Sequence, residues 1–202
     1  MALLPKNVKG STVAKFKVTY AGNFNLKELY KLIHEWLKDH YWQEIQMGSV
    51  GDKHEIFYHD RTAPSGRKDV WIWWRLERFS GNRYYKYTLN IDYLGLGLAK
   101  NQIVHNGRKI KCDDGEINVE VTAKIELDYK NEWSKNKILS SFRNMFPLRI
   151  FKADIDSHET ELWREAYDLQ GWVKKYLHLK GFLAQMEVEP FFVSREYSKG
   201  GE

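Results

Sequence analysis

The strongest constraint on this chain is the stretch from residue 70 to residue 98, where two apolar runs flank the turn-forming residues 80–83. In each run the side chains alternate between two faces, with the period of two residues that is typical of a β-strand. Aromatic and β-branched residues crowd both runs, and these types favour a pleated, at least half-buried surface. The stretch therefore predicts two long antiparallel strands joined by a short turn.

The two faces of this predicted hairpin differ in character. Apolar side chains fill one face of both strands, at Val70, Ile72, Trp74, Leu76, Tyr85, Tyr87, Leu89, Ile91 and Tyr93. The other face is charged near the turn, at Arg75 and Glu77, and becomes apolar at its far end, where it carries Trp71, Trp73, Leu94 and Leu96. Gly95 and Gly97 indicate a bend or bulge where the second strand ends. We expect one complete core face and one divided face.

Before the hairpin, the pattern predicts one strand and one helix. Residues 12–20 alternate between apolar and polar side chains, as a strand with one wet face does. Apolar residues then recur at spacings of three and four over residues 26–41, which predicts an amphipathic helix. Asn25 and Glu28 provide the side-chain acceptor and the reciprocal acid of an N-terminal helix cap.

After the hairpin, two further patterns predict strands. Asn106-Gly107 is the strongest short-range signal for a tight two-residue turn, so residues 102–105 and 108–112 are expected to form a second hairpin. Residues 116–129 then show the cleanest alternation of the whole chain. We predict a long strand there.

The C-terminal third of the chain has a helical pattern. A helix is predicted over residues 135–146, and Pro147 should end or kink it. A last, longer helix is expected to begin at Asp156 or Ser157, either of which can cap it, and to run to about His178.

These elements and the composition together predict the fold class. The 202 residues, 43% of them hydrophobic, suffice for one sizeable core. We predict a single α+β domain over residues 12–180, between an N-terminal extension at 1–11 and a C-terminal tail at 181–202. Its expected architecture is a curved antiparallel sheet of about six to seven strands, packed against an N-terminal helix and a long C-terminal helix.

Several classes of protein are disfavoured by the sequence. No apolar run approaches the roughly 20 residues needed to cross a bilayer. Only residues 2–4 are apolar before Pro5, which is too short for a secretory signal. A single cysteine, Cys112, excludes an intramolecular disulfide, so we predict a cytoplasmic protein. The net charge of +5 permits contact with nucleic acid or an acidic surface without requiring it.

The search for catalytic chemistry gives little. The chain has no HExxH, no paired CxxC, no GxxxxGK phosphate loop and no GxSxG nucleophile motif. His54, His59 and Asp60 could meet around zinc only through the fold, because their spacing is not that of a metal motif. We therefore predict no cofactor, no metal site and no catalytic residue, and favour a non-enzymatic protein.

In the order of its elements across residues 12–178, the chain resembles the START/polyketide-cyclase-like superfamily. That resemblance implies a helix-grip fold, in which a strongly bent sheet wraps the C-terminal helix and encloses an apolar cavity. It also implies that an apolar or lipid-like small molecule binds between sheet and helix, lined by Trp71, Trp73, Trp74, Tyr85, Tyr87 and Trp172. Ordinary core packing explains the same rings equally well.

Two alternative functions remain open. Basic residues cluster around the two predicted hairpins and could contact the phosphates of nucleic acid, at Arg75, Arg78, Arg83, Lys86, Lys100, His105, Arg108, Lys109 and Lys111. Glu77, Asp113 and Asp114 dilute this charge. The third possibility is a scaffold or assembly subunit, because residues 181–193 stay apolar where a free tail is ordinarily polar. In that case the segment binds a protein partner.

Overall fold

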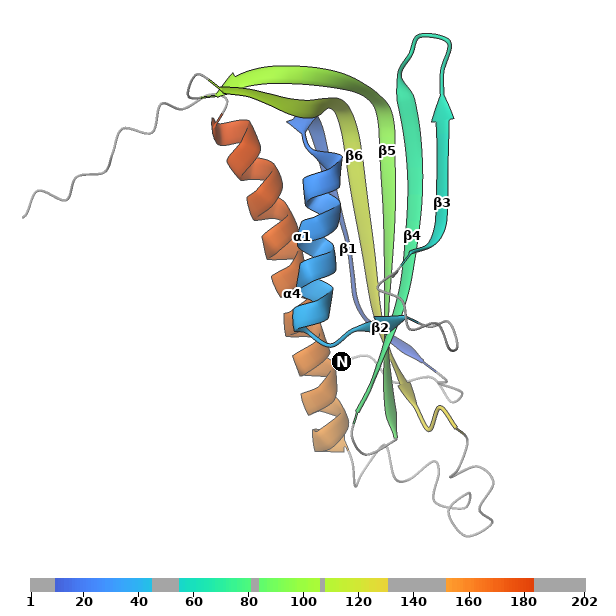
Figure 1. Cartoon of the computed structure of the whole chain (residues 1–202). Helices are drawn as coiled ribbons and strands as arrows, with labels where there is room; N and C mark the ends of the chain where they lie inside the picture. The colour runs from blue at the N-terminus through green and yellow to red at the C-terminus, as the bar shows by residue number, and fades with distance from the viewer. Residues whose placement is uncertain (1–9, 45–54, 81–83, 106–107, 131–151, 184–202) are drawn as a thin grey trace, which may run out of the picture.

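The computed structural model describes residues 10–44, 55–80, 84–105, 108–130 and 152–183. These residues form one antiparallel sheet and two helices, which makes the chain an α+β protein (Figure 1). The elements in chain order are β1 (Ser11–Phe24), α1 (Leu26–Asp39), β2 (Gln43–Glu44), β3 (Glu55–Thr62), β4 (Lys68–Phe79), β5 (Tyr85–His105), β6 (Arg108–Leu127) and α4 (Lys152–Leu183).

The strands of the sheet lie in the order β1, β6, β5, β4, and both β2 and β3 pair with the remaining edge of β4. The expected central hairpin is confirmed as β4 and β5, in which Trp74 pairs with Ile91. The described sheet has six strands, of which five are long and β2 has only two residues; the five long strands are somewhat fewer than the expected six to seven.

The strand count is lower because the expected second hairpin is not a separate unit. Gln102 pairs with Lys111 and Ile103 with Ile110, so these residues continue the pairing between β5 and β6. A β-bulge between Leu96 and Ala99 shifts the register of the pairing without ending either strand. We call the far end of this ribbon, residues 99–112, the arm; β5 and β6 curve there over the ends of the helices (Figure 1).

Glycines allow the curvature that positions the arm. Gly97 has a φ of 58°, a conformation that residues with a Cβ rarely adopt. A Cβ on Gly115 of β6 would lie 2.8 Å from the Leu96 carbonyl oxygen, so the bend leaves no room for a side chain at this position. The bend expected from Gly95 and Gly97 is confirmed.

Helix α1 begins as its sequence predicts. The Asn25 side chain accepts a hydrogen bond of 3.2 Å from the backbone N–H of Glu28, which confirms the N-terminal cap. Asp113 of β6 adds a second acceptor, 3.3 Å from the backbone nitrogen of Leu26. The helix ends at Asp39, slightly before the expected residue 41, because Tyr41 has a φ of 57° that no α-helix continues.

Helix α4 differs from the expectation at both ends. It begins at Lys152, so the predicted caps Asp156 and Ser157 lie inside it, and the Asp156 carbonyl accepts a hydrogen bond from the Thr160 hydroxyl. The buried Ile155 explains the earlier start, because it extends the apolar stripe of the helix by one turn. The helix continues to Leu183, beyond the expected end at about His178. The helix predicted over residues 135–146 lies outside the described residues.

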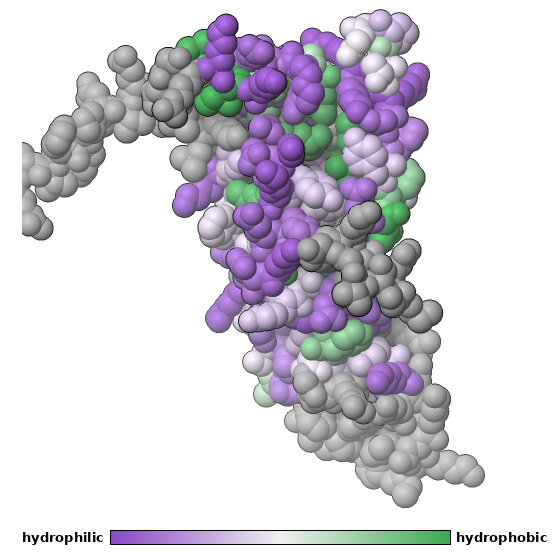
Figure 2. Space-filling model, viewed as in Figure 1, coloured by the Kyte–Doolittle hydropathy of each residue, from purple (hydrophilic) through white to green (hydrophobic). Residues whose placement is uncertain are grey.

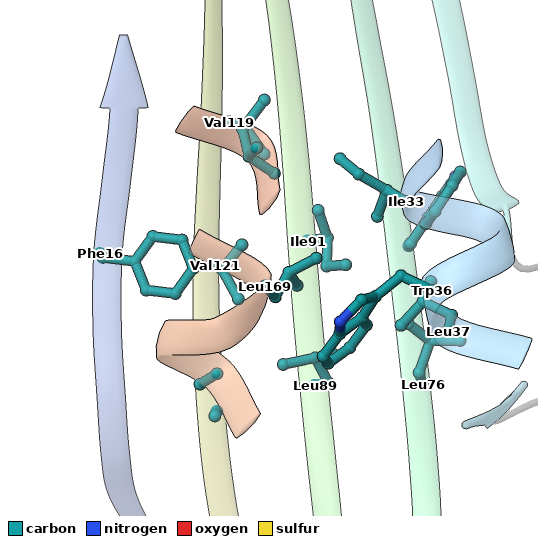
Figure 3. Close-up of a cluster of buried hydrophobic side chains, with 14 of the residues drawn as sticks. Phe16, Ile33, Trp36, Leu37, Leu76, Leu89, Ile91, Val119, Val121 and Leu169 are labelled. Atoms are coloured by element: carbon teal, nitrogen blue, oxygen red, sulfur yellow. The ribbon is translucent and has the colours of Figure 1, made fainter. Parts of the chain in front are cut away.

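The core lies between the concave face of the sheet and the two helices. Figure 3 shows its centre, where side chains of β1, β6, β5 and β4 meet those of α1 and α4. The predicted core face of the central hairpin is confirmed, because all nine of its residues are buried. The opposite side of the helices is mostly hydrophilic (Figure 2). None of the described helices is long and apolar enough to span a membrane.

Candidate binding surface

The side chains expected to line a ligand site are divided among three places. Trp74, Tyr85 and Tyr87 are buried on the concave face of the sheet. Trp71 and Trp73 belong to the opposite, convex face, because they alternate with Trp74 along β4. Trp172 of α4 is 47% exposed. The structure therefore does not bring these six aromatic residues together into one site.

Within the core, Trp74 belongs to an aromatic cluster. Its ring makes edge-on contacts with Tyr30 of α1 and Tyr93 of β5, at centroid distances of 4.7 and 5.0 Å. The Tyr30 hydroxyl donates a 3.4 Å hydrogen bond to Glu55, and burial raises the pKa of Tyr30 to about 12. The Tyr93 hydroxyl is buried and has no hydrogen-bond partner among the described residues.

At the beginning of β5, Tyr85 and Tyr87 connect the sheet to α4. The Tyr85 hydroxyl donates a 2.5 Å hydrogen bond to Asp154, and the Tyr87 hydroxyl lies 2.6 Å from Nδ1 of His158. Burial raises the pKa of both phenols, that of Tyr87 to about 12. These contacts hold the N-terminal part of α4 against β5.

Arg78 strengthens the same interface. Its guanidinium donates two hydrogen bonds, of 2.7 and 2.6 Å, to the Glu165 carboxylate of α4, a bidentate geometry. It also lies over the rings of Trp42 and Tyr87, at 4.8 and 5.3 Å from their centroids. Arg78 is therefore committed to holding the helix, and its charge is neutralised within the protein.

A pocket does open beside α4, but its chemistry does not suit an apolar ligand. Its described lining is polar and consists of Asp156, Ser157, Thr160, Glu161 and Arg164. Glu161 also lies 3.9 Å from Nδ1 of His158. No group of three or more described His, Cys, Asp or Glu side chains is arranged to hold a metal ion.

A group of partly exposed aromatic residues lies on the convex face, where β3 and β4 pair. Phe57 stands opposite Trp73 and stacks on it at 4.3 Å, and His59 stands opposite Trp71 at 5.3 Å. We call these four residues the aromatic strip. Phe57 is 38% exposed and Trp73 is 39% exposed, so the rings support one another and still present area to solvent.

Beside the aromatic strip lies an open edge of the sheet. In the described residues, β3 pairs with β4 alone, and every residue from Ile56 to Thr62 is exposed. Ile56 and Tyr58 expose 40% and 51% of their area. The outer side of β3 therefore offers backbone N–H and C=O groups to an additional strand.

Ion pairs within the protein border the aromatic strip. Arg75 contacts Asp92 at 2.5 Å, and its guanidinium lies 5.9 Å from the centroid of the Trp73 ring. Across the same convex face, Lys15 pairs with Glu120 at 2.8 Å. These paired charges leave the surface around the strip without a strong field of one sign.

The basic residues considered for nucleic-acid binding fall into two groups, those paired with a carboxylate and those at the end of the arm. Arg75, Arg78, Lys86 and Lys100 each form an ion pair, with Asp92, Glu165, Glu77 and Asp113 respectively. Arg83 lies outside the described residues. His105 and Arg108 lie at the end of the arm, where Lys109 and Lys111 are exposed.

The sequence did not identify Phe57 as a site residue, and it suggested His59 only as a possible zinc ligand. The signal was present, because residues 55–59 read Glu-Ile-Phe-Tyr-His and place apolar side chains on both faces of one short strand. A strand with that composition is buried on both sides or exposes an apolar face.

Comparisons with protein-family models and with curated proteins find no match to this chain.

Proposed function

We propose that this protein is a non-enzymatic binding protein that takes an extended polypeptide segment onto the open edge of β3. The observation that supports the proposal most directly is the exposed Phe57–Trp73 stack beside β3, which within the described residues pairs on one side only. In such strand addition, backbone hydrogen bonds provide affinity and pockets for alternate side chains provide specificity. Exposed apolar edge strands are otherwise a hazard that proteins avoid.

The chain itself contains a segment of suitable chemistry after α4. Residues 184–193 read AQMEVEPFFV, in which Met186 and Val188 alternate with Glu187 and Glu189. Phe57 lies on the convex side of β3, where it stacks on Trp73. An added strand that turns Met186 and Val188 to that side would pack them against these two rings, with Glu187 and Glu189 on its other side.

We therefore assign residues 184–193 of a second copy as the occupant, which makes the protein an assembly subunit. The same chemistry supports the view that residues after α4 contact a protein partner. Two other occupants of the β3 edge are conceivable: the same segment of the same chain, and a segment of a different protein. The experiment distinguishes both from a second copy.

The test is the mass of the full chain in solution as a function of concentration, by size exclusion with light scattering. The full chain is expected to self-associate, whereas the double substitution Phe57→Ser and Trp73→Ser should leave it monomeric. Serine replacements at Met186 and Val188 should do the same from the other side of the contact. Trp163→Ser is the control, because Trp163 of α4 is 48% exposed but lies outside the aromatic strip.

A synthetic peptide of residues 184–193 completes the test. It should inhibit association of the full chain, and it should bind less tightly to the double variant of the aromatic strip. A chain that stays monomeric at every concentration contradicts the assembly role. If such a chain also gives no peptide binding, strand addition itself is excluded for this segment.

A second candidate function is the apolar or lipid-like ligand that the START-like resemblance implies. The buried Tyr93 hydroxyl favours it, because an unpaired buried hydroxyl costs about 1–3 kcal/mol and a bound polar head group can satisfy it. Mass spectrometry of denatured, freshly purified protein tests this idea. One apolar molecule per chain supports it, particularly if Tyr93→Phe reduces its amount, and a protein that releases none contradicts it.

A further inference from the structure

The arm is locally rich in positive charge. Residues 101–112 read NQIVHNGRKIKC, which includes one arginine, two lysines and no carboxylate. Lys100, at the base of the arm, is neutralised by Asp113 at 2.5 Å. Lys109 and Lys111 are exposed, and no acidic side chain in the described ranges lies within ion-pair distance of either.

The pairing of the arm places these lysines on one face of a two-stranded ribbon. Gln102 pairs with Lys111 and Val104 with Lys109, and side chains of cross-strand partners lie on the same side. Because residues two apart along a strand share a face, all four side chains lie on one surface. All four are exposed, Val104 by 69%. The arm thus presents a narrow face with two cations and one amide.

We propose that this face of the arm contacts a nucleic-acid duplex. The major groove of B-form DNA is wide enough for a two-stranded β-ribbon. Lysines contact the phosphates, which position a protein on the duplex, and glutamine can reach phosphate, sugar or base edges. The contact uses an element remote in sequence from the aromatic strip and is independent of the assembly role.

An acidic lipid surface is the competing partner for a basic ribbon. Proteins that bind at the bilayer interface use Trp, Phe or Leu as apolar anchors beside their cations. The face of the arm offers Val104 alone among its described apolar residues, which is a small anchor. Nucleic acid therefore fits the composition of the arm better.

The same geometry predicts a weak dependence on salt. Arg75, Arg78, Lys86 and Lys100 are occupied by their own carboxylates, so the phosphate contacts fall mainly to Lys109 and Lys111 of the arm. With about two to three contacts, the slope of log affinity against log salt should be about −2 to −3.

The experiment is fluorescence anisotropy of the full chain with a labelled DNA duplex of about 20 base pairs, at several potassium chloride concentrations. Lys109→Gln with Lys111→Gln should weaken binding about tenfold at low salt and reduce the salt slope by about two. The matched control is Lys17→Gln with Lys174→Gln, which removes the same charge from exposed positions of β1 and α4. The control should change affinity less than about twofold.

Three results would overturn the proposal. Equal weakening in both double variants would mean that the net charge alone attracts DNA. Absence of binding at low salt would exclude the contact. Binding to phosphatidylserine vesicles that is lost in the Lys109 and Lys111 variant, without binding to DNA, would assign the arm to lipid. Circular dichroism and the melting temperature confirm that each variant is folded.

Discussion

Trp73 and Trp74 are neighbours on β4 and have opposite environments. Trp74 faces the helices, is completely buried and contacts Tyr30 and Tyr93. Trp73 faces away from them, is 39% exposed and stacks on Phe57. The comparison shows that adjacent large aromatic residues of one strand can differ completely in burial, one belonging to the core and the other remaining partly exposed.

The largest difference between the faces should appear in stability. Trp74→Ala is expected to lower the free energy of unfolding by about 3–5 kcal/mol, because it removes a buried indole and leaves a cavity. Urea unfolding followed by circular dichroism measures the change. A loss below about 1 kcal/mol would show that the concave cluster is not tightly packed.

The ion pair between the sheet and α4 should have the next largest effect. Arg78→Met is expected to cost about 3 kcal/mol, because it leaves the Glu165 carboxylate largely buried without its partner. Adding Glu165→Leu should recover part of that loss, since it removes the uncompensated charge. Thermal and urea unfolding of the two single variants and the double variant give the coupling. Strictly additive losses would contradict the described contact.

Alkaline pH should act on the concave face through its tyrosines. Burial holds the pKa of Tyr30 and Tyr87 at about 12, above the value near 10 of an exposed phenol. The unfolded chain therefore releases these protons first. The contribution of the two tyrosines to the free energy of unfolding is fully present below pH 10 and is lost as the pH rises towards 12. Tyr87→Phe should make this fall shallower in urea unfolding measured at several alkaline pH values. An unchanged slope would indicate that the Tyr87 phenol ionises as readily in the folded state as in the unfolded chain.

Much of the fold follows from local patterns in the sequence. Alternation identified the core face of β4 and β5, and the cap at Asn25 placed the start of α1. The error at the arm came from placing the bend expected at Gly95 and Gly97 at the end of a strand, whereas the strand continues beyond it. A bulge and a strand end have the same residue signature, and the cross-strand register decides between them.

The candidate site was harder to predict because it depends on what covers each face. The alternation showed that Trp71 and Trp73 share a side of β4, but it could not show whether a helix covers that side. Likewise, the positive charges of Arg75 and Lys86 are visible in the sequence, whereas their pairing with Asp92 and Glu77 depends on strand register. Both the cover of a face and the partner of a charge depend on which segments, distant in sequence, lie next to each other in the fold.

The smallest stability effect, and the sharpest contrast with Trp74, is expected on the convex face. Trp73→Ala should lower the free energy of unfolding by about 1 kcal/mol or less, because its exposed ring loses mainly the stack on Phe57. Binding of the peptide of residues 184–193 should nevertheless fall, as measured by fluorescence anisotropy of labelled peptide. A variant that loses stability as Trp74→Ala does, or that binds the peptide unchanged, would show that the exposed ring serves the fold and not recognition. The two neighbouring tryptophans thus separate packing from binding within a single strand.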